Sequence, residues 1–369
     1  MSNFNILMIS PRRTGKSSML ASMISNFDTV CSYSQIHLKA DESTKDLLKN
    51  KTDSLEEKIK KHKVGESFPI DENRTTQPYD YTFTLTVNGS EKKHTLIFTD
   101  INGGIIYKDL ELDNLKEKIS KSQILIIAID TPHLMEENGR FNKPFNNPHK
   151  MESLLHNFSE KEPVKLILFI PLKCEKYYYE GRMDEVNSRV KMAYADLLKE
   201  YGTNPKVKSQ YTVAITPILT AGGIVFDDFG RDEFGEVDAI RESSNPELFY
   251  RPKKAFYKLY QNKPYFCPQF CEQPVLYLLN FILKYDKIVV KKEVKKEKQK
   301  GIMRAIEVVV KGIFGILMSA LALLLGDRDD LIELWRDLFS DRKLIEEAVK
   351  VKGNIKTSGD GYEIIQNPF

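Results

Sequence analysis

A short loop between an apolar run and a helical pattern constrains the fold of this chain more than any other feature. The run Phe4–Ile9 has strand character, and the loop after it ends in Gly15-Lys16-Ser17. Apolar residues then recur at helical spacing over 19–27. A strand, such a loop and a helix bring loop amides and a helix N-terminus together on one anion. The sequence therefore predicts a phosphate-binding loop; the alternative is a chance Gly-Lys-Ser at the start of a helix.

Most positions of this loop have an expected function. Lys16 supplies positive charge for the β- and γ-phosphates, and the Ser17 hydroxyl is a ligand for Mg²⁺. Ser10 stands where the loop pattern has its first glycine, which is acceptable if the Ser10 backbone stays out of the left-handed region. The residues expected to surround the phosphates are Ser10, Pro11, Arg12, Arg13, Thr14, Gly15, Lys16, Ser17 and Ser18.

Strand and helix patterns alternate along residues 1–286. Two strands flank Asn88-Gly89 and predict an antiparallel hairpin. The runs 124–129 and 164–170 are almost continuously apolar, as in parallel strands that are buried on both faces. The predicted strands are 4–9, 81–87, 94–99, 124–129, 164–170 and 211–216, and the predicted helices are 16–27, 47–59, 183–200 and 273–286. This order predicts an α/β fold with a doubly wound, mostly parallel sheet that closes near Tyr285.

Two short segments around the hairpin add to the phosphate loop. Thr99-Asp100-Ile101-Asn102-Gly103 ends the second hairpin strand, and Arg74-Thr75-Thr76 precedes the first. In this order the segments resemble the Ras-like and translation-factor (TRAFAC) class of P-loop GTPases. The resemblance implies that Asp100 holds Mg²⁺ through water and that the Gly103 amide approaches the γ-phosphate. It also implies a Mg²⁺ ligand at Thr75 or Thr76, which the sequence does not separate; the alternative is threonine at an ordinary strand entry.

The same resemblance extends to recognition of the base. The family has Asn-Lys-x-Asp after the strand 164–170, and this chain has Leu172-Lys173-Cys174-Glu175. The resemblance implies that the Lys173 stem packs on the base plane and that Glu175 accepts from the guanine N1 and N2 groups, although the asparagine is missing. Thr220-Ala221-Gly222 falls where the family has a loop whose amide, here that of Ala221, meets guanine O6. Together these segments favour guanine over adenine.

Two departures from the family pattern bear on hydrolysis. Gly104 stands where efficient Ras-like enzymes have a glutamine that orients water. Arg12 and Arg13 occupy loop positions that small residues usually hold. One reading is that an arginine supplies charge to the phosphates in cis and so takes part in catalysis with Lys16; the other is that both face solvent. We expect slow intrinsic turnover, or activation by a partner.

The remaining segments indicate surfaces for partners and carry no predicted catalytic residue. Residues 223–271 are rich in aromatic residues and proline without periodicity, which indicates an inserted loop excursion that serves as a partner surface or as a lid that completes the core. A lysine-rich linker at 287–300 precedes a hydrophobic and amphipathic helical segment at 301–352. The run 302–326 suits burial in a protein partner or homo-oligomer, with membrane contact as the alternative. The tail 353–369 is expected to be weakly ordered.

Composition narrows the setting of the protein. Its 369 residues carry a net charge of +3, which by itself does not indicate nucleic-acid binding. Four cysteines are few for this length and suit a reducing cytoplasm. The first strand starts at once, which leaves no room for a signal peptide. We expect a cytoplasmic protein, with membrane association depending on 302–326.

Three functions compete at this point. The first is a regulatory GTPase that binds GTP and Mg²⁺ and is similar to divergent prokaryotic GTPases, which are often associated with defence operons; that association is analogy alone. The second is an ATP-dependent P-loop enzyme, for which Asp130 after the strand 124–129 is the candidate catalytic carboxylate. The third is a nucleotide-binding scaffold or membrane-associated module with negligible turnover.

Overall fold

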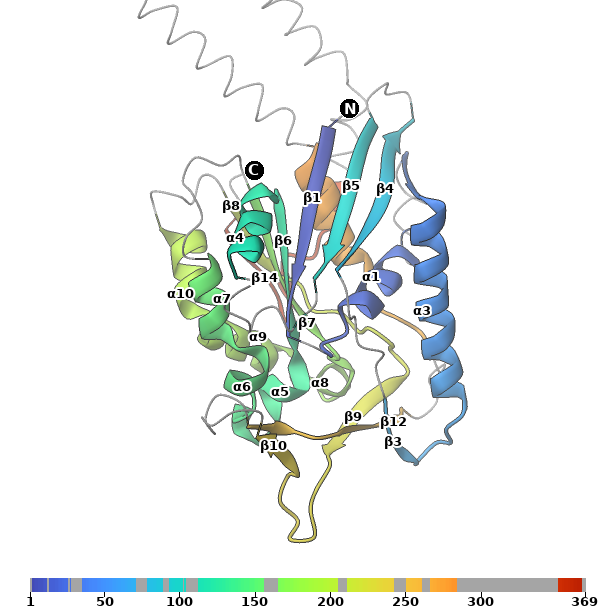
Figure 1. Ribbon diagram of the computed structural model, residues 1–369, viewed down its shortest axis with the longest axis vertical. Coiled ribbons are helices and arrows are strands. Elements are labelled where there is room, and N and C mark those ends of the chain that lie inside the picture. Colours follow the sequence, from blue (N-terminus) through green and yellow to red (C-terminus); the bar gives the residue numbers. More distant parts are fainter. Residues whose placement is uncertain are drawn as a thin grey trace, which may run out of the picture.

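The fold is known from a computed structural model, and all structural statements below concern the residues that it describes. These are residues 2–11, 13–25, 27, 35–70, 78–88, 93–101, 103, 112–155, 165–204, 211–241, 250–260, 266–283 and 351–366. Figure 1 shows a large twisted sheet with helices packed against it. A smaller sheet lies beyond the ends of its parallel strands.

The large sheet has nine strands in the order β13-β14-β8-β7-β6-β1-β5-β4-β2. Its strands are β1 (Ser2–Ile9), β2 (Ile36–Ala40), β4 (Tyr79–Val87), β5 (Lys93–Asp100), β6 (Ile124–Asp130), β7 (Lys165–Leu172), β8 (Tyr211–Ile215), β13 (Ser358–Gly359) and β14 (Tyr362–Gln366). The run from β5 through β1, β6 and β7 to β8 is parallel. Every residue of β6 and β7 is buried, so the prediction of a mostly parallel sheet from apolar runs is confirmed.

The hairpin that Asn88-Gly89 predicted is also present. β4 and β5 pair antiparallel over Tyr79↔Asp100 to Thr86↔Lys93. On β4 buried and half-buried residues alternate, because one face packs on the core. β2 pairs antiparallel with β4 and extends the sheet beyond the hairpin; this strand was not expected from the sequence.

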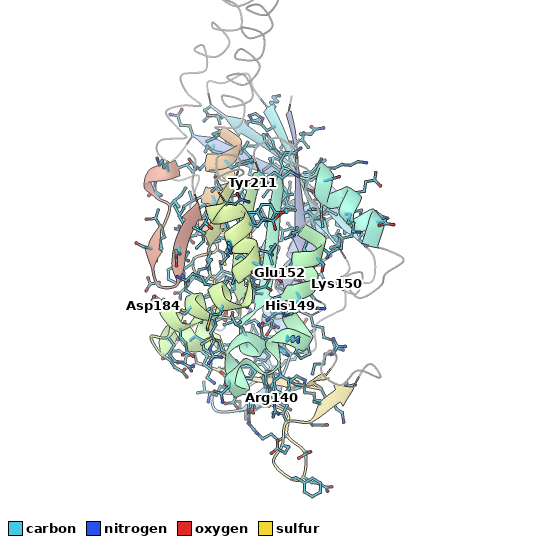
Figure 2. All side chains as sticks on the ribbon, turned by 90° about the vertical axis from the view of Figure 1, so that its left-hand side faces the viewer. Arg140, His149, Lys150, Glu152, Asp184 and Tyr211 are labelled. Carbon is cyan, nitrogen blue, oxygen red and sulfur yellow. The ribbon has the colours of Figure 1, made fainter. Side chains whose placement is uncertain are left out.

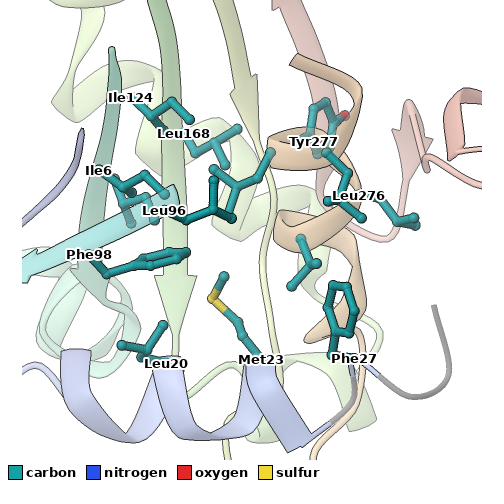
Figure 3. Close-up of a cluster of buried hydrophobic side chains, with 14 of the residues drawn as sticks. Ile6, Leu20, Met23, Phe27, Leu96, Phe98, Ile124, Leu168, Leu276 and Tyr277 are labelled. Carbon is teal, nitrogen blue, oxygen red and sulfur yellow. The ribbon is translucent and has the colours of Figure 1, made fainter. Parts of the chain in front are cut away.

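Helices cover both faces of the sheet. On one face, Leu20 and Met23 of α1 meet Phe98 of β5 and Leu276 of the helix at 272–283 (Figure 3). On the other face, α4, α7 and α9 pack on alternate residues of the same strands, such as Leu7. The helices are α1 (Lys16–Ser25), α3 (Glu42–Lys60), α4 (Leu112–Lys121), α5 (Thr131–Met135), η3 (Glu136–Gly139), α6 (Asn142–Asn146), α7 (Pro148–Leu155), α8 (Glu175–Tyr179), α9 (Met183–Ala193), α10 (Ala195–Leu197) and η4 (Leu198–Thr203).

The outer side of this second helical layer is polar. Figure 2 views it directly, with His149, Lys150 and Glu152 on α7 and Asp184 at the start of α9. His149 Nδ1 lies 3.2 Å from Glu152 Oε2, one turn along the helix. The predicted helix at 183–200 is present but is interrupted at Tyr194, after which α10 and a π-helical turn follow.

The insertion is more regular than its sequence indicated. Residues 223–271 were expected to form a loop excursion, but the parts of this range that the structure describes, 223–241, 250–260 and 266–271, contain four short strands: β9 (Ile224–Phe229), β10 (Ala239–Arg241), β11 (Tyr250–Pro252) and β12 (Ala255–Leu259). β12 pairs with β9 and with β3 (Ser67–Pro69), and β10 pairs with β11. A separate apolar cluster, which includes Phe226 and Ile59 of α3, holds this small sheet in place. The sequence did not indicate these strands because they are short, and because one of them, β12, also pairs with β3 far away in the sequence.

The tail is part of the fold and not a weakly ordered end. β14 pairs antiparallel with β8 and closes that edge of the large sheet. Tyr362 is 2% exposed and donates from its hydroxyl to the Pro217 carbonyl. The α/β layer therefore closes with β13 and β14, not with the helix at 272–283 alone.

The linker 287–300 and nearly all of 301–352, with the hydrophobic run 302–326, lie outside the described residues. Their predicted helices, partner contacts and membrane contact stay predictions. Among the residues that are described, no helix is both long and apolar enough to cross a membrane.

Candidate functional site

The predicted phosphate loop connects β1 to α1 at the carboxyl end of the parallel strands. Ser10 and Thr14 both donate to the Pro11 carbonyl, at 3.0 and 2.9 Å, and thereby close the loop on itself. Gly15 has φ of +102°, which is accessible to glycine at little cost. Ser10 stays out of the left-handed region, as its replacement of glycine requires. Its hydroxyl accepts from Lys16 Nζ at 3.0 Å.

Three side chains converge next to this loop, two from the start of α1 and one from the end of β5. Ser17 Oγ donates to Asp100 Oδ2 at 2.6 Å, and Lys16 Nζ lies 3.8 Å from Asp100 Oδ1. All three residues are buried, and Asp100 is fully so. Lys16, Ser17 and Asp100 are brought together as predicted because β1 and β5 are paired in parallel, with Met8 opposite Asp100.

The Asp100 carboxylate is suited to a cation. Its Oδ1 is buried and accepts no hydrogen bond from any described residue, and an unsatisfied buried charged oxygen costs several kcal/mol unless a cation or water meets it. Mg²⁺ in phosphate sites takes one or two protein oxygens and completes its shell with phosphates and water. Within the described part of the chain, no three His, Cys, Asp or Glu residues lie close enough together to hold a metal ion by themselves. A metal at Asp100 would therefore need ligands from the phosphates and water.

Tyr81 belongs to this cluster and was not singled out from the sequence. It lies on β4, it is 3% exposed, and burial together with the nearby Asp100 carboxylate raises its pKa to about 12. Its phenol therefore keeps its proton at neutral pH. The alternating pattern of the strand 81–87 indicates that Tyr81 points into the core. The sequence does not indicate that Tyr81 lies near Asp100, because this depends on the register of β4 against β5.

Lys173 ties the phosphate loop to the neighbouring strand end. Its Nζ donates to the Arg13 carbonyl at 3.0 Å and to Asp130 Oδ2 at 2.9 Å. Both Arg13 and Lys173 adopt φ near +60°, a conformation that costs a non-glycine residue of order 1–3 kcal/mol and persists where the surroundings enforce it. Lys173 thus lies at the site, as predicted, with its ammonium on the loop backbone.

Asp130 is the buried centre of a second polar cluster. Its Oδ1 accepts from the His133 backbone amide and lies 2.6 Å from His133 Nδ1, while its Oδ2 accepts from Lys173. Burial alone would raise the pKa of this carboxyl, but Lys173 and His133 outweigh it and hold the pKa well below its usual value. Asp130 therefore caps α5 and pairs with two basic groups, and both of its oxygens are engaged. His133 was missed, although Asp-x-x-His after a buried strand is a readable capping pattern.

Two of the three groups predicted to recognise the base, Glu175 and the Ala221 amide, lie against each other. Glu175 Oε1 accepts from the amides of Ala221 and Gly222, at 2.8 and 3.1 Å. Burial raises the pKa of Glu175, and these two amides and Lys173 partly offset it. The Ala221 amide is thus directed at Glu175 in this structure, and a guanine O6 at this amide would compete with that contact.

The remaining predicted residues divide into two groups. Gly103 is buried directly after β5, and Ser18 is half-buried in α1. Arg13 is exposed at the rim of the loop. The predicted residues Arg12, Thr75, Thr76 and Gly104 lie outside the described residues, so their assigned functions stay predictions.

Comparisons with known proteins find little similarity to this chain. No family model and no curated protein matches the chain. Among solved structures, the GTPase-like domain of S. cerevisiae Ski7, bound to GDP and inorganic phosphate, is similar with a TM-score of 0.37 and 12% identity. The match covers 67% of this chain and 48% of that one, so it spans about half of that neighbour. A similarity of this size carries no argument about function.

Proposed function

We propose that this protein is a guanine-nucleotide-binding P-loop NTPase, a regulatory GTPase that uses Mg²⁺. The cluster of Lys16, Ser17 and Asp100 carries the proposal. A lysine at a helix start, a hydroxyl beside it and a buried carboxylate with an unsatisfied oxygen are the groups that a nucleoside triphosphate and its Mg²⁺ need together. Lys16 would take the β- and γ-phosphates, while Ser17 and Asp100 would hold the metal directly and through water. Mg²⁺ would supply neutralisation of the charge that develops on the phosphates.

Guanine is the favoured base, with Lys173, Glu175 and the Ala221 amide as the groups that would recognise it. The closeness of these groups supports this reading: the Ala221 amide donates to Glu175 Oε1 at 2.8 Å, a contact that guanine would replace. The competing ATPase reading depends on Asp130 as a catalytic carboxylate. Because both Asp130 oxygens are engaged by Lys173 and His133, the geometry favours a structural function for that residue.

Slow intrinsic turnover follows from the same residues. Gly104 offers no side chain to orient water, and Arg13 lies exposed at the loop rim, where it can add charge without being held against a phosphate. We infer that the protein is a switch that a partner activates. The insertion 223–271 and the segment 301–352 are the proposed partner surfaces, and in the alternative reading 302–326 contacts a membrane. A setting in prokaryotic defence is proposed by analogy alone.

Replacing Lys16 tests the proposal. Lys16→Ala should weaken binding of GTP about 100-fold, since hydrogen bonds to a charged group contribute up to about 3 kcal/mol. Fluorescent GTP and ATP analogues titrated into the purified protein with Mg²⁺ measure this, and a melting curve checks the fold. Lys60→Ala is the matched control, because Lys60 is exposed on α3 and pairs only with Glu56. Undiminished binding by Lys16→Ala would refute the phosphate loop, and tighter binding of ATP would refute guanine preference.

A further inference from the structure

The loop 216–223 connects β8 to β9 and contains the Ala221 amide that is proposed to meet the base. Its first support comes from Gln269, which exchanges two backbone hydrogen bonds of 3.0 Å each with Leu219. Two residues before Gln269, the Cys267 amide donates to the Ala221 carbonyl at 2.8 Å. The chain just before the helix at 272–283 therefore holds this loop along most of its length.

The second support comes from the last described segment, residues 351–366. Tyr362 on β14 donates from its hydroxyl to the Pro217 carbonyl, at the start of the loop, at 2.8 Å. β14 lies beside β8 in the large sheet and pairs with it (Figure 1). Next to Tyr362, the Gly361 carbonyl accepts from Asn187 Nδ2 at 2.9 Å. Because the backbone around Tyr362 is fixed in this way, its hydroxyl can hold the loop in place.

Phe270 connects the two supports. It adopts φ of +63°, a conformation that persists in a non-glycine residue where the surroundings enforce it. Its ring packs edge-on against Tyr362 with centroids 6.2 Å apart, and Lys356 Nζ lies 4.2 Å from the Phe270 centroid. On another side the Phe270 ring meets Tyr178 of α8, the helix that begins with Glu175, at 5.2 Å. Both supports of the loop therefore lead to residues 351–366.

We infer that residues 351–366 position the loop 216–223 for recognition of the base and thereby set how fast a guanine nucleotide leaves the protein. Tyr362 is the positioning residue, because it acts through the loop and not on the nucleotide. The inference rests on the proposed function, since it concerns the base site of Glu175 and Ala221. Losing one support raises the frequency of local opening, and each opening withdraws the Ala221 amide from the base.

Tyr362→Phe tests this inference, because it removes the hydroxyl and keeps the ring. Tyr201→Phe is the matched control: Tyr201 is also a buried tyrosine, and its hydroxyl donates to the Leu155 carbonyl on α7. The full chain is loaded with fluorescent GDP and Mg²⁺ and chased with unlabelled GDP. Release should be roughly 3- to 10-fold faster from Tyr362→Phe than from wild type, the factor that one neutral hydrogen bond is worth. Tyr201→Phe should release GDP at the wild-type rate.

Amide hydrogen exchange of the nucleotide-free protein measures the loop directly. Peptides that cover 216–223 should exchange at least threefold faster in Tyr362→Phe than in Tyr201→Phe. Lys356→Met is a second variant, because it removes the ammonium over the Phe270 ring and keeps an apolar side chain of similar length. It should also raise exchange in this loop, while Lys352→Met, at an exposed position of the same segment, should not.

The outcomes separate this inference from the proposed function. If Tyr362→Phe and Tyr201→Phe do not differ in loop exchange or in GDP release, Tyr362 only stabilises the fold and the inference is overturned. Faster loop exchange with unchanged GDP release also overturns it. If the wild-type protein binds no guanine nucleotide, the proposed function fails, and the exchange data alone decide whether residues 351–366 position the loop.

Discussion

Two residues of this site, Glu175 and Asp130, each make more than one kind of contact. Glu175 was assigned to the base from its position after β7, but its Oε1 also holds the amides of Ala221 and Gly222. Asp130 caps α5 and also anchors Lys173, whose ammonium fixes the Arg13 carbonyl. Substitutions at these positions therefore need readouts that separate binding from folding.

Base preference is tested at Glu175. Glu175→Ala should weaken GTP binding by about 1–3 kcal/mol, roughly 10- to 100-fold, and affect ATP much less, since guanine N1 and N2 lose their acceptor. Competition titrations with both nucleotides give the ratio. Glu175→Gln is the companion variant, because its amide oxygen still accepts from Ala221 and Gly222, and it should keep the melting temperature without restoring GTP preference. Equal losses for GTP and ATP in both variants would show that Glu175 only shapes the loop.

Stability depends on Asp130 in a pH-dependent way. Removing one member of a buried ion pair costs about 3–5 kcal/mol, so Asp130→Asn should lower the free energy of unfolding at pH 7 by about that amount. The pKa of Asp130 in the folded protein lies below the value of about 3.9 for a free aspartate. The ionised form therefore stabilises the fold above pH 4, and this contribution falls as the pH drops through the lowered pKa.

Urea unfolding at pH 7 and at progressively lower pH checks the Asp130 prediction. The difference between wild type and Asp130→Asn should shrink below pH 4. Asp196→Asn, at an exposed position on α10, is the control and should change stability by less than about 0.5 kcal/mol. A difference that is the same at pH 7 and at acid pH would mean that the Asp130 charge does not matter.

At the level of elements, the insertion and the edge strands explain how the site is enclosed. The small sheet β3-β12-β9 joins residues 67–69, before the predicted threonine ligands, to residues after β8. The loop that contains Ala221 and Gly222 connects β8 of the large sheet to β9 of this small sheet. This loop is held from the other side by Cys267, whose amide donates to the Ala221 carbonyl at 2.8 Å.

Gly222 is the position where this enclosure admits no side chain. Its φ is +71°, and a Cβ there would lie 1.8 Å from the Cys267 carbonyl oxygen. Gly235, in the β9–β10 turn, has φ of +78° and nothing within 4 Å. Gly235→Ala should cost about 1–2 kcal/mol from backbone strain alone, and Gly222→Ala should cost about 1–3 kcal/mol more from overpacking. Chemical denaturation measures both, and equal costs would show that the 266–271 segment moves away freely.

At the level of the whole molecule, the last described segment, residues 351–366, packs against the core. Hydrogen bonds join the helix at 272–283 to residues 351–366: Tyr277 Oη donates to the Lys356 carbonyl, the Lys356 amide donates to Gln273 Oε1, and Gln273 Nε2 donates to the Asn354 carbonyl. Val351 is fully buried and belongs to the same apolar cluster as residues of α1 and of this helix. Residues 351–366 therefore belong to the same core as the helix at 272–283, while the predicted helical segment 301–352 lies almost wholly outside the described residues and stays a prediction.

The packing of residues 351–366 on the core decides the expected outcome of truncation. Replacing residues 287–350 with a flexible linker of about 12 residues, which reach about 20 Å on average, should leave a folded protein that still binds nucleotide. Deleting 287–369 should destabilise it, because β8 loses its partner β14 and Tyr362 is removed. Melting curves and nucleotide titrations of both proteins check this. A truncated protein that melts and binds like the linker version would mean that β13 and β14 are dispensable.

The sequence by itself determined the local elements and their order. Apolar runs such as 124–129 specify strands buried on both faces, Asn88-Gly89 specifies the hairpin, and Ser10–Ser17 specifies a loop between a strand and a helix. These signals are local, because periodicity and turn chemistry depend on neighbours along the chain. Lys16, Ser17 and Asp100 were identified in this way, since parallel strand ends meet at one edge of a sheet.

Only the tertiary structure determined which residues far apart in the chain are in contact. Short strands such as β3 and β14 carry no pattern of their own and become strands because a distant edge offers them backbone partners. The pairing of Asp130 with Lys173, of Glu175 with Ala221, and of Tyr362 with Pro217 likewise joins residues far apart in the chain. Burial and charge at these contacts arise from folding, so no local pattern in the sequence encodes them.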